Sequence, residues 1–102
     1  MTEKMKPSTV TEEAKLLNVT EEIVRGLVAF SLHGPDYPTF CRCRKCELDI
    51  NAITLNHLDN HFVTTKEDRE KAYAILKKPD SIAQINKHII RAIHIVGQKP
   101  VH

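Results

Sequence analysis

The sequence predicts an all-α fold, a compact bundle of about four helices with a cysteine-rich metal loop. Glycine is scarce, at 3 of 102 residues, and the segments between turn signals carry apolar residues at helical rather than alternating spacing, so strands have little room. The three cysteines, Cys41, Cys43 and Cys46, are clustered, which excludes a framework of long disulfide loops. Stability must therefore come from a helical core, with a metal as additional support.

The length and charge of the chain limit its architecture and its partners. A mass of 11.6 kDa allows one core, and we expect residues 1–8 to form a disordered tail and residues 9–102 a single domain. Fifteen Lys and Arg against 13 Asp and Glu give a net charge of +2, too weak to drive nucleic-acid binding by bulk electrostatics. No apolar run approaches the roughly 20 residues of a membrane span, and the amino terminus lacks a secretory signal, so we expect a cytoplasmic protein with no membrane partner.

The first predicted helix ends at Gly34 and Pro35. Thr11 or Thr20 can cap it, and both a single helix from Thr11 and two helices broken near Asn18 fit the pattern. Acidic pairs follow both possible caps, where the helix dipole favours them. The expected apolar face comprises Ile23, Leu27 and Phe30.

Two shorter helices are predicted in the middle of the chain. The second helix starts at Cys46, and the third covers 66–77, after an extended or loop segment at 62–65 and before Pro79. The predicted inward residues of the second are Leu48, Ala52, Ile53, Leu55 and Leu58, and those of the third are Ala72, Ile75 and Leu76.

The last helix has the clearest pattern. Ser81 with Gln84 three residues later forms a capping box, and Gly97 and Pro100 are expected to end the helix. Ile90 and Ile95 lie outside the main stripe, so a second subunit would cover them in a symmetric homodimer; the alternative is that the first helix wraps this face. The main stripe comprises Ile82, Ile85, Ile89, Ala92, Ile93 and Val96.

The cysteine cluster predicts a zinc site. Cys41 and Cys43 precede a helix and Cys46 lies at its start, so one turn can direct three thiolates at one ion. Three thiolates with a dication leave a formal −1, which Arg42, Arg44 and Lys45 can neutralise. A histidine or a water would complete the tetrahedron, and spacing identifies none of the six histidines as the ligand. The alternatives are reduced cysteines that only pack, or a labile disulfide.

The residues around the cluster are similar to a known family. The pattern Cys41-x-Cys43-x-x-Cys46-x-x-Asp49-x-x-Ala52-x-x-Leu55-Asn56-x-Leu58, followed by Phe62-Val63-Thr64, resembles the late-competence ComFB family of small bacterial proteins, and the similarity extends from about Asn18 to Pro100. The resemblance implies an all-helical dimer with zinc on the cysteines and no enzymatic activity. Some relatives are receptors for cyclic di-GMP that influence competence or motility. Family members commonly read Pro-Pro-x-Tyr where this chain has Asp59-Asn60-His61-Phe62. Some relatives also have a fourth cysteine without a counterpart here, and the resemblance makes a tail histidine such as His102, or a solvent ligand, its substitute.

A cyclic dinucleotide carries two phosphates and two purines, so its site needs cationic forks and flat groups. The densest candidates just past the motif are Lys66, Arg69, Lys71 and Tyr73, of which Lys66 and Arg69 are the predicted contacts. The alternative is a solvated helix face with pairs such as Glu67 with Lys71.

Other function classes find less support. The chain has no phosphate-binding glycine loop, no nucleophile elbow and no His-Glu-x-x-His, so we expect no enzyme. The competing hypothesis is a zinc-stabilised nucleic-acid adaptor that uses Arg42, Arg44 and Lys45, and a third is a thiol sensor that exchanges metal for a disulfide.

Overall fold

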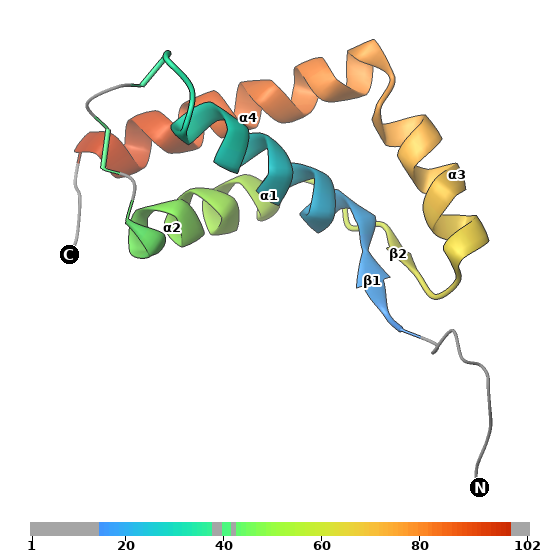
Figure 1. The fold of residues 1–102 in the computed structure, drawn as a ribbon. Coiled ribbons are helices and arrows are strands. Elements are labelled where there is room, and N and C mark those ends of the chain that lie inside the picture. Colours follow the sequence, from blue (N-terminus) through green and yellow to red (C-terminus); the bar gives the residue numbers. More distant parts are fainter. Residues whose placement is uncertain (1–14, 38–39, 42, 99–102) are drawn as a thin grey trace, which may run out of the picture.

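The computed structural model describes residues 15–37, 40–41 and 43–98, and within them it contains four helices and one short β-ladder (Figure 1). The all-α fold class is confirmed, while the predicted tail at 1–8 lies outside the described residues. The two strands pair antiparallel, with Leu17 opposite Val63. In chain order the elements are β1 (Leu17–Asn18), α1 (Val19–Leu32), α2 (Arg44–Leu55), β2 (Phe62–Val63), α3 (Lys66–Leu76) and α4 (Pro79–Gln98).

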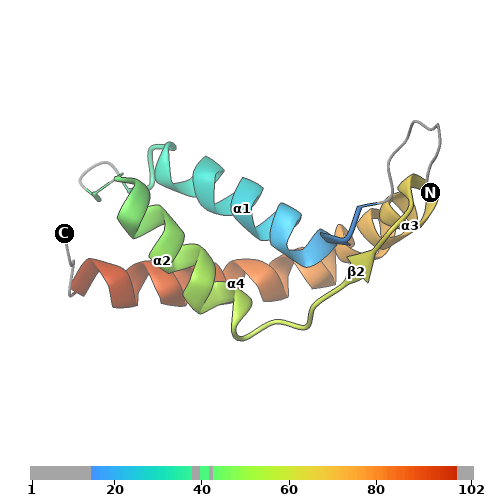
Figure 2. The same ribbon diagram turned by 90° about the horizontal axis from the view of Figure 1, so that it is seen from below.

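The longest helix, α4, runs along the length of the molecule, and α1 and α2 pack against it (Figures 1 and 2). The described residues between α1 and α2 lie beside the carboxyl end of α4, whereas α3 and the β-ladder lie at the opposite end in both views. The cysteines and the predicted phosphate contacts therefore occupy opposite ends of the molecule. None of the helices in the described part has the length and apolar character that crossing a bilayer demands.

The apolar stripe of α4 forms the centre of the core, as predicted. Ile85, Ile89, Ala92, Ile93 and Val96 are buried, while Ile90 and Ile95 are 48% and 45% exposed. Large aliphatic residues at helical spacing form a single apolar stripe, and the helix buries that stripe by turning it toward the core. The prediction holds for this reason.

The start and the face of α1 differ from the prediction. The helix begins at Val19 after Asn18, and Thr20 is no cap, because its hydroxyl donates to the carbonyl of Asp59 at 2.9 Å. Phe30 is 78% exposed, so its assignment to the apolar face is wrong. The residues of α1 that are buried are Val19, Thr20, Ile23, Val24, Val28 and Leu32.

The predicted face of α2 is only partly correct, because Ile53, Leu55 and Leu58 are partly buried against the core but Leu48 and Ala52 are not. Leu48 is 39% exposed and Ala52 faces solvent, whereas Cys46, Ile50 and Thr54, each four residues apart, are buried. Because α2 packs against both α1 and α4, the burial of Cys46 fixes the rotation of the helix. Hydrophobic periodicity gives little weight to threonine and cysteine. It therefore assigned Leu48 and Ala52 to the core rather than Cys46 and Thr54.

The junction between α3 and α4 corrects the capping prediction. Helix α4 begins at Pro79, a residue suited to a first helical position because its missing N–H has no partner there. Ser81 is therefore inside the helix, and its hydroxyl donates to the carbonyl of Ile75 at 3.3 Å. Ile75 is 51% exposed rather than inward, whereas Ala72 is buried as predicted. Gly97 does not end α4, which continues to Gln98.

Two polar oxygen atoms are buried on α2. Asn51 Oδ1 and Thr54 Oγ1 have no hydrogen-bond partner among the described residues, and Thr54 is 0% exposed. A buried hydroxyl without a partner costs free energy that an apolar group of the same shape does not.

We expect Thr54→Val to raise the free energy of unfolding by about 1 kcal/mol, because the methyl replaces an unpaired hydroxyl at the same volume. Chemical denaturation of the two proteins measures the difference. Thr65→Val is the matched control, since the Thr65 hydroxyl caps α3 by accepting from the Asp68 N–H at 3.0 Å, and its loss should destabilise. Destabilisation by Thr54→Val would show that the hydroxyl is satisfied in solution.

Candidate functional site

The three cysteines converge at the amino-terminal end of α2. Cys43 is the N-cap residue, with extended backbone, and its sulfur accepts a hydrogen bond from the Cys46 N–H at 3.4 Å. Cys46 lies in the first turn and is 1% exposed, while Cys41 and Cys43 are half-buried. The sulfur atoms of all three lie within 4.8 Å of one another, so the structure brings the predicted ligands together.

This spacing fits a tetrahedral metal ion. Zinc bound by thiolates at about 2.3 Å places neighbouring sulfur atoms roughly 3.8 Å apart. The observed separations need only a small contraction, and Cys41 and Cys43 belong to a segment without regular structure that can supply it. Among the described residues the group consists of cysteines, which are soft ligands that select zinc over magnesium or calcium.

The charge of the cluster depends on the protonation of its thiols. The pKa of the Cys43 thiol is lowered, chiefly because the Cys46 N–H donates to its sulfur. Burial, reinforced by the neighbouring thiols, raises the pKa of Cys46 to about 12. Three adjacent thiolates repel one another, and a bound dication is the group that would hold all three in the charged form.

Of the three cations predicted to neutralise the cluster, Lys45 forms an ion pair. Lys45 is paired with Asp49, which accepts from its ammonium at 2.8 and 2.9 Å. This ion pair raises the pKa of Lys45, with the nearby thiols as a smaller cause. Arg44 is exposed on the first turn of α2, and Arg42 lies outside the described residues. The lysine is thus held beside the cluster by a carboxylate four residues away.

The fourth ligand stays a prediction. His102 lies outside the described residues. His57, which follows α2, packs instead against His88 of α4, with the two rings edge to face and their centroids 5.7 Å apart. Within the described residues the cluster therefore supplies three of the four positions of a closed site.

An aromatic residue lies between the cysteine loop and α4. An added methyl group at Gly97 would come within 3.1 Å of the Phe40 ring, so the absence of a side chain at Gly97 admits the ring. Phe40 immediately precedes Cys41 and packs against the core. This contact, which the sequence did not suggest, places the entrance of the loop against the last turns of α4.

At the opposite end, the predicted phosphate contacts Lys66 and Arg69 line one hollow of about 380 Å³. It lies at the amino-terminal end of α3, where Thr65 caps the helix. Lys71 pairs with Glu67 at 3.6 Å, as the solvated-face alternative predicted. We call this space the cationic hollow, and its lining residues are Lys15, Leu17, Glu22, Thr64, Thr65, Lys66 and Arg69.

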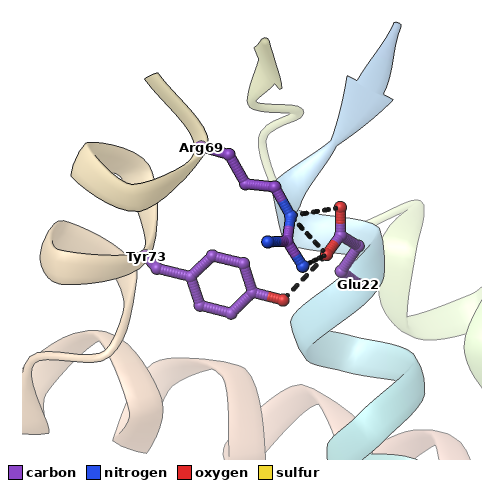
Figure 3. A network of polar contacts seen from close by, with 3 residues as sticks. All are labelled: Glu22, Arg69 and Tyr73. Carbon is purple, nitrogen blue, oxygen red and sulfur yellow. Dashed lines mark hydrogen bonds and ion pairs between the residues drawn. The ribbon is translucent and has the colours of Figure 1, made fainter. Parts of the chain in front are cut away.

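The Arg69 guanidinium is already engaged by a carboxylate of α1. Its Nη2 donates to Glu22 Oε1 at 2.6 Å, and its Nε donates to Oε1 and Oε2 at 3.0 and 3.2 Å (Figure 3). The Tyr73 hydroxyl donates to the same Oε1 at 2.9 Å, and the guanidinium and the Lys77 ammonium lie 5.0 and 5.1 Å from the Tyr73 ring centroid. A fork of this kind recognises carboxylate and phosphate alike.

Sequence reasoning missed Glu22 as the partner of Arg69. It assigned Glu21 and Glu22 to the helix dipole, and both do lie in the first turn of α1. The two paired residues are 47 positions apart, and no local spacing relates them. The local sequence signal for this site was Arg69 four residues before Tyr73 on one helix. The carboxylate of Glu22 comes from α1 and is brought there by the tertiary fold.

The Arg69 pair should make stability depend on pH. Hydrogen bonding to Arg69 lowers the pKa of Glu22 from its ordinary value of 4.5, so the stabilisation is present above that value and is lost as the pH falls through the folded pKa. We expect Glu22→Gln to cost about 1 kcal/mol or less at neutral pH, since both groups are partly exposed, and progressively less as the pH falls below 4.5. Denaturation across this range measures it.

Glu21→Gln is the control for this prediction, because Glu21 lies in the same turn but pairs with Arg25 at 3.2 Å. That pair joins exposed side chains four residues apart, so its loss should have a smaller effect. Equal losses for the two variants at every pH would contradict a specific role for the Arg69 contact.

Comparisons with known proteins agree with this fold. A family model described as late competence development protein ComFB matches residues 17–100. A solved structure of the late competence protein ComFB from Bacillus subtilis has a TM-score of 0.71 and 20% sequence identity, and the match covers 85% of this chain and 96% of that one. At that identity the structural likeness concerns the fold alone. No curated protein matches the chain. From the family match over most of its length, the chain belongs to the ComFB family.

Proposed function

We propose that the protein is a non-enzymatic regulatory module of the ComFB type that holds a structural zinc ion, forms a homodimer and binds cyclic di-GMP in a process linked to competence or motility. The observation that carries the proposal is the convergence of three sulfur atoms within 4.8 Å in a chain of this family. A thiolate site needs reduced cysteines, which supports a cytoplasmic location.

The role of the zinc ion is structural in this proposal. Cys41 lies in the loop between α1 and α2, and Cys46 lies on the buried face of α2. One ion bound to both residues would therefore fix the position of the loop relative to the helix. With a fourth protein ligand the site would be closed and would have no open position for substrate, which fits the proposed absence of catalytic activity. When bound, the ion would supply positive charge that keeps the thiols ionised.

The homodimer is supported by the apolar groups that one chain leaves uncovered. Ile90 on α4 and Phe30 on α1 are 48% and 78% exposed, which is costly for large side chains in a monomer of this size. Two-fold pairing of identical faces is the commonest way to cover such groups. Analytical ultracentrifugation should therefore give a molecular mass twice that of the single chain.

The cationic hollow is the proposed site of the messenger. Its volume of about 380 Å³ accommodates part of a dinucleotide, and Lys66 stands at the start of α3, where helix N–H groups favour a phosphate. Tyr73, the flat group expected from the sequence, does not line this hollow, and its ring contacts Arg69 and Lys77. Because Glu22 occupies the Arg69 fork, a phosphate must displace this carboxylate to use both donors.

For the metal, we expect one zinc ion per chain in the purified protein and a lower content in Cys43→Ser, because serine is a poor ligand for zinc. Removing the ion with a chelator should lower the melting temperature by roughly 10 °C with the helices retained. Elemental analysis and calorimetry measure both effects, and re-addition of zinc, but not of magnesium, should reverse the loss. An unchanged melting temperature after complete removal would contradict a structural ion.

For the messenger, we expect calorimetry to detect binding of cyclic di-GMP that Lys66→Ala weakens by roughly fivefold, since one cation–phosphate contact is lost. Lys87→Ala is the matched control, because Lys87 is an exposed lysine of α4 outside the hollow. A short DNA duplex is titrated in parallel at physiological salt. Saturable binding of DNA with no response to cyclic di-GMP would instead favour the nucleic-acid adaptor.

A further inference from the structure

A second hollow, of about 320 Å³, opens where four segments meet: the first turn of α1, the segment after α2, the end of α3 and the start of α4. Its floor is apolar and is formed by Leu58, Leu76 and Ile85. Asp59 and Asp80 also line it and are exposed. We call it the acidic hollow. Its volume lies within the range of small-molecule sites.

The groups that line this space are rich in hydrogen-bond acceptors and poor in donors. The Thr20 hydroxyl donates to the Asp59 carbonyl at 2.9 Å, and the Ser81 hydroxyl donates to the Ile75 carbonyl at 3.3 Å. Both hydroxyl protons are therefore already used, and the carboxylates of Asp59 and Asp80 accept only. Among the lining side chains, the Gln84 amide keeps donors of its own.

The two carboxylates of the acidic hollow form no ion pair in the described part of the chain, although Asp80 lies in the first turn of α4, where the helix dipole favours a negative charge. No ion pair involves Asp59 or Asp80 there, in contrast to Glu22, Asp49 and Glu67, which each hold a cation. Lys78 precedes Asp80 by two residues and does not pair with it. Two unpaired carboxylates above an apolar floor repel anions, so a cyclic dinucleotide is a poor occupant.

We propose that the acidic hollow binds the alkyl-ammonium end of a linear aliphatic amine, with a polyamine as the class of ligand. An ammonium group carries three donors and no acceptor, which matches lining groups that mainly accept. The methylene chain covers Leu58, Leu76 and Ile85 and removes their surface from water. A simple metal cation gains nothing from such a floor, and an uncharged alcohol gains nothing from the carboxylates.

The test uses the zinc-loaded full chain and titrates spermidine, n-pentylamine and 1-pentanol by calorimetry and by methyl NMR of Leu58, Leu76 and Ile85. We expect both amines to shift these methyl signals and the alcohol to bind at least tenfold more weakly than pentylamine. Asp59→Asn and Asp80→Asn should each weaken spermidine binding by roughly threefold, as for partly exposed ion pairs. Both side chains are exposed, so these variants should fold.

Asp36→Asn is the matched control, because Asp36 is an exposed carboxylate in the turn after α1 and does not line the hollow. If this variant lost as much spermidine affinity as Asp59→Asn and Asp80→Asn, the loss would come from the net charge of the protein rather than from the hollow. That result would overturn the proposal. Methyl signals that do not move, or a response to pentanol equal to that to pentylamine, would overturn it as well. Binding of cyclic di-GMP should be unchanged in Asp80→Asn, which separates this proposal from the function of the cationic hollow.

Discussion

The burial of Cys46 is the constraint on which the rest of the structure depends. This residue is 1% exposed and lies on the same face of α2 as Ile50 and Thr54, so the rotation that packs the helix also directs a sulfur toward the loop. Cys43 then falls at the N-cap, where its sulfur accepts the Cys46 N–H. The core and the proposed metal centre thus share one residue, and neither can be rearranged without the other.

The segment after α2 is held in place by hydrogen bonds to the start of α1. It contains Asp59 and Asn60 and no proline. Here the Asn18 side chain donates to Asn60 Oδ1 at 3.1 Å and accepts from the His61 N–H at 3.0 Å, while the Val19 N–H donates to the His61 carbonyl at 2.8 Å. Hydrogen bonds to the start of α1 therefore fix the backbone of this segment, and they align β1 with β2.

The sequence predicted those features that depend on local repetition. The stripe of α4 and the clustering of three cysteines follow from spacing alone, and both were found as expected. The face of α2 was not predictable in this way, because its buried positions include Thr54, a residue that hydrophobic periodicity does not count. The Glu22–Arg69 pair joins residues 47 positions apart, and only the packing of α1 against α3 brings them together.

Helix α1 also explains how two spaces of opposite charge can lie close together. Thr20 lines the acidic hollow and Glu22 lines the cationic hollow, and residues two positions apart point to nearly opposite sides of a helix. Helix α3 contributes to both spaces from its two ends, with Leu76 at its last position in the first space and Arg69 near its start in the second. The first turn of α1 therefore separates the two hollows, and a ligand that displaced Glu22 from Arg69 would remove a contact between the two helices that both spaces share.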